Sequence, residues 1–385
     1  MRKFVVLGDI VLPGGEIAGG YVAVRDGKIE KIGSGTKVKG YKNQEILDYR
    51  GAKIIPGLID IHVHGGGGAD FLDDDPYAIE TIISTHRRYG TTSLLAGVMT
   101  APREEMLAAL HRLREAAAGR KEILGIYLEG PYLNPRQKGC QPEEELRLPD
   151  RREAEEFLAA AGPALKIFAL APELPGAAEV IQEAHSRGIV VAAGHTNATF
   201  AEMTKAFTWG VSHAAHLYNA MRGLHQREPG AVGAFLQRRE ATVELIADGV
   251  HVHPEMIRFL LAVKDKENII LVSDATAACG MPDGTYRIGG QKLKLVKGVG
   301  RLEDGTLAGG AVPLLKGVET MVRKLGLSLG EAVAMASFNP ARLLGIAARK
   351  GSLEPGKDAD LVVLDGFRPL LVVSGGEIHK IKNPS

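Results

Sequence analysis

Cysteine, net charge and long apolar runs are all scarce in this sequence of 385 residues. Its two cysteines, Cys140 and Cys279, are too few for a disulfide framework and predict reduced thiols in a cytoplasmic protein. A formal net charge of +1 argues against nucleic acid or an anionic membrane as a partner and favours a small-molecule ligand. No apolar run approaches the roughly 20 residues that span a bilayer. Gly8 and Asp9 interrupt the apolar N-terminal stretch, so it makes a poor signal peptide.

The composition that is present, 45% hydrophobic and 24% charged, is that of a soluble globular protein. Both ends of the chain are rich in short β runs, and Asp26-Gly27 is a hairpin signal. The first fifty residues predict a small antiparallel unit, and the last thirty repeat the pattern. We therefore expect a discontinuous β-sandwich domain over 1–54 and 353–385, and a larger domain over 55–352.

In the larger domain, β-branched apolar runs alternate with amphipathic helical stretches, which predicts a parallel sheet. No Gly-rich dinucleotide fingerprint follows the first run, which disfavours the alternative of an open doubly wound sheet. Eight βα units predict an α/β fold with a (β/α)8 TIM-type barrel, whose active site lies at the carboxyl ends of the strands. The runs are Ile54–Ile61, Thr91–Ala96, Ile123–Leu128, Lys166–Leu170, Ile189–Ala193, Ser212–Ala215, Thr242–Ile246 and Ile269–Val272.

A His-Val-His sequence, His62 to His64, ends the first of these runs. Side chains two residues apart on a strand point to the same face, so both imidazoles can reach one point beyond the strand. This geometry suits a metal ion, although two hydrogen-bonded core histidines would give the same sequence. The other strand ends must decide between these interpretations.

Four further chemically active side chains fall at strand ends, where a barrel brings them together. They are Glu129, His195, His216 and Asp274. Imidazole and carboxylate ligands without thiolate suit Zn²⁺, Fe²⁺ or a similar first-row divalent ion. His213, three residues before His216, is expected to be a packed or supporting residue. Asp274 is our first choice for a general base, with a simple metal ligand or a helix N-cap as the alternatives.

These motifs resemble those of the amidohydrolase superfamily and, within it, the N-acetylglucosamine-6-phosphate deacetylases. The resemblance runs from the first strand almost to the end of the chain. It rests on Pro56-Gly57-Leu58-Ile59-Asp60, Leu128-Glu129-Gly130-Pro131, Gly194-His195-Thr196-Asn197-Ala198-Thr199, His216-Leu217-Tyr218-Asn219-Ala220-Met221, Ile246-Ala247-Asp248-Gly249-Val250-His251, Ser273-Asp274-Ala275 and Leu307-Ala308-Gly309-Gly310.

The resemblance implies hydrolysis of the acetamide of N-acetyl-D-glucosamine 6-phosphate to glucosamine 6-phosphate and acetate, in amino-sugar catabolism and cell-wall recycling. Glu129, His195 and His216 then match the principal metal ligands. Asp274 matches the acid/base that acts with a metal-activated hydroxide. The resemblance also implies a homodimer that completes the phosphate site. The implied substrate contacts are Cys140, Gln141, Asn219, Ala220, Arg227, His251, Leu307, Ala308 and Gly309.

Two features depart from some members of that family. This chain has His62 and His64 and so resembles the members able to hold two metal ions rather than one. At position 141 it has Gln, where some members have a His that polarises the acetyl carbonyl. Gln141 can donate a hydrogen bond but cannot become cationic, so we expect the metal to supply most of the polarisation.

Two other functions stay open at this stage. One is deacetylation of the galactosamine epimer, which differs in a single hydroxyl configuration. The other is a non-catalytic binding protein on an amidohydrolase scaffold, which the complete set of strand-end residues disfavours.

Overall fold

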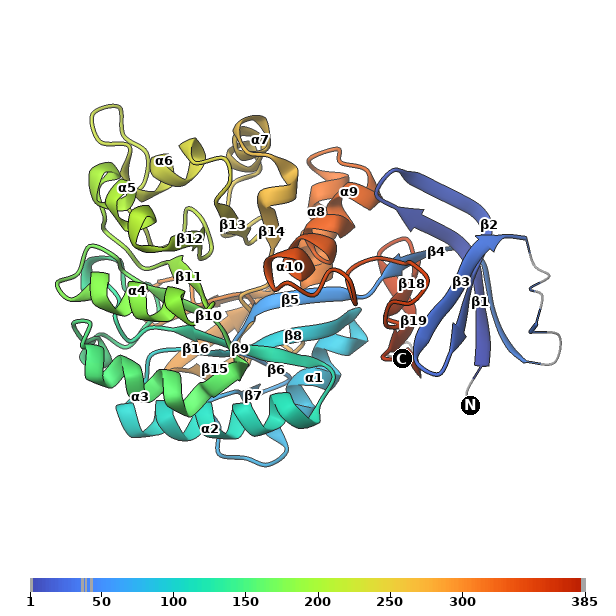
Figure 1. Cartoon of the computed structure of the whole chain (residues 1–385), viewed down its shortest axis with the longest axis horizontal. Helices are drawn as coiled ribbons and strands as arrows, with labels where there is room; N and C mark the ends of the chain where they lie inside the picture. The colour runs from blue at the N-terminus through green and yellow to red at the C-terminus, as the bar shows by residue number, and fades with distance from the viewer. Residues whose placement is uncertain (1–2, 36–37, 39, 42–43, 382–385) are drawn as a thin grey trace. The chain divides into compact units, whose positions relative to one another are not determined.

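A computed structural model describes residues 3–35, 38, 40–41 and 44–381 (Figure 1). The chain divides into two compact units. One comprises Met1–Asp60, His86–Ser93 and Leu314–Ser385, and the other comprises Ile61–Thr85 and Leu94–Pro313. The predicted domain boundaries at 54/55 and 352/353 stay a prediction.

The first unit is built on a seven-stranded sheet from both ends of the chain, with strand order β20-β19-β18-β4-β1-β2-β3. Side chains from β1, β2, β18 and β19 share one apolar core, so the sheet folds over on itself as a sandwich does. The strands are β1 (Lys3–Leu12), β2 (Gly15–Arg25), β3 (Lys28–Ser34), β4 (Glu45–Pro56), β18 (Leu361–Asp365), β19 (Arg368–Ser374) and β20 (Glu377–Lys380). The helices of this unit are α8 (Leu314–Arg323), α9 (Leu329–Met335) and α10 (Phe338–Leu343).

The antiparallel prediction for the N-terminal region is correct for β1 to β3 and wrong for β4. Strand β4 pairs with β1 in parallel and with β18 in antiparallel. The sequence pattern did not reveal this because β4 pairs with one strand from each end of the chain.

The barrel sheet has eight strands in the order β14-β13-β12-β11-β10-β9-β8-β5, and neighbouring strands from β8 to β14 pair in parallel. A parallel bridge between Val63 and Ala275 joins the end of the first strand to the segment after the last. The predicted (β/α)8 fold is therefore confirmed. The strands are β5 (Leu58–Val63), β8 (Thr91–Val98), β9 (Ile123–Glu129), β10 (Leu165–Leu170), β11 (Val190–Ala193), β12 (Val211–Ala214), β13 (Thr242–Leu245) and β14 (Ile269–Leu271).

The first predicted run, Ile54–Ile61, is divided between two strands at Gly57, because β4 ends at Pro56 and β5 begins at Leu58. A Cβ atom at Gly57 would lie 2.2 Å from Thr92 Oγ1, so a larger residue could not pass this point without a shift. His62 and His64 nevertheless keep the predicted position at the carboxyl end of the strand.

Helices lie outside the strands that they connect (Figure 1). They are α1 (Ala78–Arg88), α2 (Arg103–Gly119), α3 (Arg151–Ala161), α4 (Ala177–Ser186), α5 (Phe200–Trp209), α6 (Gly230–Gln237) and α7 (Pro254–Val263). Short 3-10 helices cover Pro135–Gln137, Glu143–Glu145, Gly162–Ala164 and Lys266–Asn268. Small antiparallel sheets join β6 (Gly65–Gly66) to β7 (Ala69–Asp70), and β15 (Gly284–Ile288) to β16 (Gln291–Val296) and β17 (Val299–Arg301).

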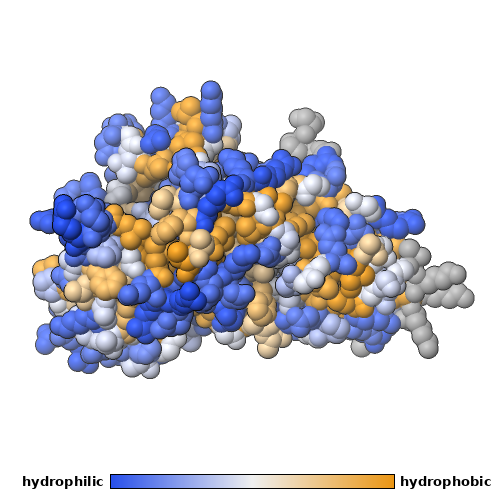
Figure 2. All heavy atoms as spheres, turned by 90° about the horizontal axis from the view of Figure 1, so that it is seen from above, coloured by the Kyte–Doolittle hydropathy of each residue, from blue (hydrophilic) through white to orange (hydrophobic). Residues whose placement is uncertain are grey.

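The surface mixes hydrophilic and hydrophobic residues on the face drawn in Figure 2. Among the described residues, no helix combines the length and the apolar character needed to cross a membrane.

Candidate metal centre

The strand ends of the barrel bring six predicted side chains into one place. His62 lies near the end of β5 and His64 just beyond it, and Glu129 is the last residue of β9. The other three follow β11, β12 and β14 within two or three residues; they are His195, His216 and Asp274. Five of the six side chains are buried, and Asp274 is partly exposed. The ligand atoms form two groups, within each of which all atoms lie within 4.8 Å of one another.

The first group consists of Glu129, His195 and His216. Glu129 Oε1 lies 3.2 Å from His195 Nε2 and 2.9 Å from His216 Nε2. The Nδ1 atoms of His195 and His216 lie 2.9 Å and 3.2 Å from the backbone oxygens of Gln137 and Asn219. Carbonyl oxygens only accept, so both Nδ1 atoms must donate. In the neutral rings, Nε2 then offers a lone pair toward Glu129, as in a metal ligand.

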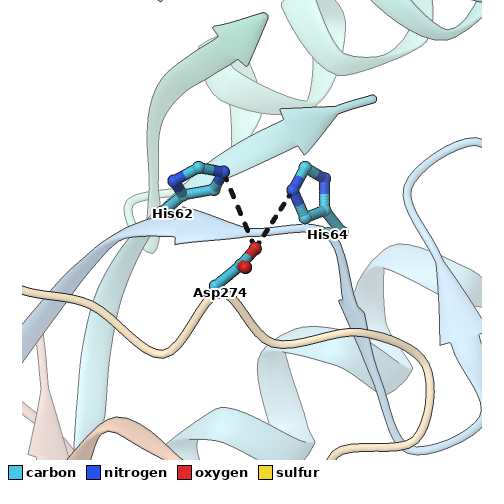
Figure 3. A group of neighbouring side chains, drawn as sticks. All are labelled: His62, His64 and Asp274. Carbon is cyan, nitrogen blue, oxygen red and sulfur yellow. Dashed lines mark ion pairs between the residues drawn. The ribbon is translucent and has the colours of Figure 1, made fainter. Parts of the chain in front are cut away.

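The second group consists of His62, His64 and Asp274, which point toward one another in Figure 3. Asp274 Oδ1 lies 3.7 Å from His62 Nε2 and 3.4 Å from His64 Nε2. Glu129 stands between the two groups, because its Oε1 lies 3.5 Å from His62 Nε2 and its Oε2 lies 3.3 Å from His64 Nε2. The geometry therefore allows one carboxylate to serve both groups.

The electrostatics of the centre demand positive charge. Burial by itself raises the pKa of Glu129, but His195 and His62 outweigh it and hold that pKa well below its ordinary value. Burial also opposes the shift at Asp274, whose pKa the charges of His62 and His64 lower. Burial lowers the pKa of His62, His64 and His216, but the neighbouring carboxylates outweigh it and raise all three. Protons on these rings therefore balance the carboxylates when no cation is bound, and a bound cation would replace them. The donor set of carboxylates and imidazoles fits one or two first-row divalent cations.

The backbone around the centre adopts an uncommon conformation. His195, His216 and Asp274 have φ values of 47°, 27° and 50°, and Tyr218 and Ala220 are also in the left-handed region. Residues other than glycine rarely adopt this backbone conformation, and those that do are concentrated at functional sites. Nothing in the residue types at these positions predicted this feature.

A cavity of about 430 Å³ opens over the centre. Of the predicted substrate contacts, those that line it are Cys140, Gln141, Asn219, Ala220, His251, Leu307 and Gly309. Ala308 is fully buried and does not line the cavity, and Arg227 is exposed and also lies outside its lining.

Two basic residues that the sequence analysis missed, Arg136 and Lys138, also line the cavity. Both lie in the loop that follows β9. Their position directly before Cys140 was the available signal, because a loop after a barrel strand faces the site.

Buried Glu244 and His213 were also not predicted as site residues. Glu244 lies within β13, and its carboxylate contacts His62 and His213 at 2.7 Å and 2.9 Å. His213 is fully buried, as expected for a packed or supporting residue. The signal for Glu244 was an acidic residue inside an apolar, β-branched run. Its partners could not be predicted, because they are distant in sequence.

The chain belongs to the amidohydrolase family, whose model matches residues 54–383. It is 37% identical to an N-acetylglucosamine-6-phosphate deacetylase from Bacillus subtilis (strain 168) over 94% of this chain and 93% of that protein. It is 41% identical to an N-acetylgalactosamine-6-phosphate deacetylase from Escherichia coli O157:H7 over 81% of this chain and 83% of that protein.

A solved structure with the same fold is a mutant N-acetyl-D-glucosamine-6-phosphate deacetylase from Mycobacterium smegmatis in complex with N-acetyl-D-glucosamine-6-phosphate. It matches with a TM-score of 0.92 and 32% identity, covering 98% of this chain and 99% of that one. The predicted family resemblance is therefore confirmed.

Proposed function

We propose that this protein hydrolyses the acetamide of N-acetyl-D-glucosamine 6-phosphate, giving D-glucosamine 6-phosphate and acetate. The proposal rests on one observation: the two groups of possible cation ligands lie at a cavity that is also lined by basic side chains. The choice of substrate follows the names of the relatives, which are N-acetylglucosamine-6-phosphate deacetylases.

The proposed cation ligands are Glu129, His195 and His216 at one position and His62, His64 and Asp274 at the other. A divalent first-row ion such as zinc or iron would there activate water and polarise the acetamide carbonyl. Glu129, between the groups, would orient the ligands of both.

Asp274 is proposed to move the proton. One carboxylate oxygen of Asp274 would take a proton from the attacking water and return it to the amide nitrogen as that nitrogen departs. This return matters because an amide nitrogen is too basic to leave as an anion. The Asp274 carboxylate is in the base form at neutral pH, because the ordinary pKa of an aspartate is about 3.9. Positive charge beside it, on His62 first, outweighs burial and lowers that pKa further.

The 6-phosphate is proposed to meet the basic side chains of the cavity, Arg136, Lys138 and His251. His251 Nδ1 donates to Asp248 Oδ2 at 2.7 Å, which leaves Nε2 for a ligand. Arg227 is exposed and outside the cavity lining. Its predicted phosphate contact is therefore proposed to reach the site of a second copy in a cytoplasmic homodimer.

The Escherichia coli relative favours a second candidate function, deacetylation of the galactosamine 6-phosphate. An acetate-release assay should compare both 6-phosphates and unphosphorylated N-acetylglucosamine, with cation content measured on the same preparation. We expect the highest kcat/KM on the gluco 6-phosphate. A higher value on the galacto epimer would move the assignment to that substrate, and a preference for the unphosphorylated sugar would contradict the phosphate site.

A further inference from the structure

Glu244 is a carboxylate with no exposed surface, and neither proposed cation group contains it. An ionised carboxylate is costly to bury unless hydrogen bonds and charges compensate for the lost water. Its partners include His62 Nδ1 at 2.7 Å, His213 Nε2 at 2.9 Å and the backbone N–H of His216 at 3.0 Å. Two of these residues are proposed cation ligands: His62 belongs to the group with His64 and Asp274, and His216 to the group with Glu129 and His195.

The contact with His62 sets which ring nitrogen carries hydrogen. An ionised carboxylate only accepts, so His62 Nδ1 must donate and the neutral ring presents its Nε2 lone pair on the other side. That Nε2 faces Glu129 Oε1 and Asp274 Oδ1. The ring of Tyr127 stacks on His62 with 4.1 Å between centroids, which restricts the ring further.

The contact with His216 acts on the backbone. The same Oε2 atom that meets His62 accepts the N–H of His216, whose φ of 27° is unusual for a residue with a side chain. The hydrogen bond that this N–H donates to a buried carboxylate offsets the cost of this conformation. Glu244 therefore holds the segment that carries a ligand of the first group.

His213 completes the chain of hydrogen bonds behind Glu244. Its Nε2 donates to Glu244 Oε1, and its Nδ1 lies 2.6 Å from Thr242 Oγ1, which can donate in return. A neutral His213 thus satisfies both neighbours, and the carboxylate is anchored from the side away from the cation groups.

We propose that Glu244 is a positioning residue that couples the two cation groups, by fixing the tautomer of His62 and the backbone of His216 with one oxygen atom. The inference rests on the proposed cation sites and is independent of which sugar is the substrate. Loss of Glu244 should weaken the group of His62 most, because that group loses control of a ligand ring.

The test is titration of the metal-free protein with Zn²⁺ and with Co²⁺ in the absence of substrate. Glu244→Gln keeps the size of the side chain but replaces one acceptor oxygen with a donor, which cannot satisfy both histidines in their present tautomers. We expect cation affinity at the His62 group to fall about 10- to 100-fold, with a changed Co²⁺ absorption spectrum. The control is Glu240→Gln, the same substitution at a mainly exposed residue just before the strand, which should bind as the parent does.

If the parent binds two ions and Glu244→Gln binds both with unchanged affinity, the positioning role is wrong. If the parent itself binds no Zn²⁺ or Co²⁺, the proposed cation sites are wrong instead. Circular dichroism checks that the variant folds. If it does not fold, Thr242→Val removes the far end of the chain of hydrogen bonds. It should weaken the same affinity several-fold, and an unchanged affinity would then overturn the inference.

Discussion

Gln141 donates a hydrogen bond from Nε2 to Glu129 Oε2 at 2.6 Å. Its own Oε1 accepts the backbone N–H of Thr100 at 3.0 Å. The buried Gln141 side chain therefore connects Glu129, at the end of β9, to Thr100, just after β8, and restricts the Glu129 carboxylate. This contact gives Gln141 a structural task besides the predicted hydrogen bond to the acetyl carbonyl, which stays a prediction.

Replacing Gln141 with Leu should damage both stability and activity. Leu has a similar size but leaves the Thr100 N–H and Glu129 Oε2 without these partners. We expect the free energy of unfolding to fall by about 1 to 3 kcal/mol and kcat to fall about 10- to 100-fold. Chemical denaturation and acetate release measure the two effects.

The control is Gln182→Leu, the same substitution at an exposed residue of α4 that lies outside the cavity lining. Equal losses of unfolding free energy and kcat in both variants would contradict the supporting role of Gln141.

Asp274→Asn should remove the proposed proton carrier and lower kcat by several orders of magnitude. Asn keeps an oxygen that can face His62 and His64, so cation content should change less than activity. Elemental analysis and acetate release are measured on one preparation, with exposed Asp283→Asn as the control. A kcat within about tenfold of the parent would contradict the role, and loss of the ion with rescue by added metal would favour a simple ligand.

The strand-end residues were predictable because barrel topology alone places them. Each of His62, Glu129, His195 and His216 follows or ends a recognisable β-branched run, and the carboxyl ends of parallel strands converge. The substrate contacts came from the family resemblance, and most of them line the cavity.

The supporting contacts were not predictable for a physical reason. Gln141 meets Thr100 across 41 positions, and Glu244 meets His62 across 182. No local period or propensity encodes such a pair. The position of Arg227 outside the cavity lining likewise depends on how its loop folds, which its neighbours in sequence do not determine.

Lys138→Met should raise KM for the phosphorylated substrate without an equal effect on the unphosphorylated sugar. The loss of a charge-assisted contact predicts an increase of about 10- to 100-fold, with kcat changed less. Steady-state kinetics on both sugars checks this. Lys292→Met, at a mainly exposed residue outside this cavity, is the control. Equal loss on both sugars would show that Lys138 supports the loop rather than the phosphate.

Lys264 predicts a specific dependence of stability on pH. Burial lowers its pKa from 10.5 to about 8, although its ammonium donates to the backbone oxygens of Phe235 and Arg238. Between about pH 8 and 10.5 the unfolded chain then binds more protons than the folded one. Stability from this group therefore rises with pH in that window, by up to about 1.4 kcal/mol per pH unit.

Comparison of the parent with Lys264→Met isolates this contribution from that of other titrating groups. The difference between their free energies of unfolding, followed by chemical denaturation from pH 7 to 10.5, should change above about pH 8. A difference that stays constant across the range would show that the carbonyl contacts hold the pKa near its ordinary value.

Removal and replacement of cations should separate the two groups. Extended chelation should abolish acetate release, and added Zn²⁺ or Co²⁺ should restore it, because the proposed reaction needs a cation to activate water. His195→Gln removes a ligand whose Nδ1 is fixed by the Gln137 carbonyl, so we expect activity to be lost even at high metal concentration. His64→Gln removes a ligand of the second group and should lower the ion count from two to one per chain, with a smaller loss of activity. Exposed His111→Gln, in α2, controls for a general effect of removing histidine. Full activity of the chelated parent, with metal content confirmed near zero, would contradict the proposed role of both groups.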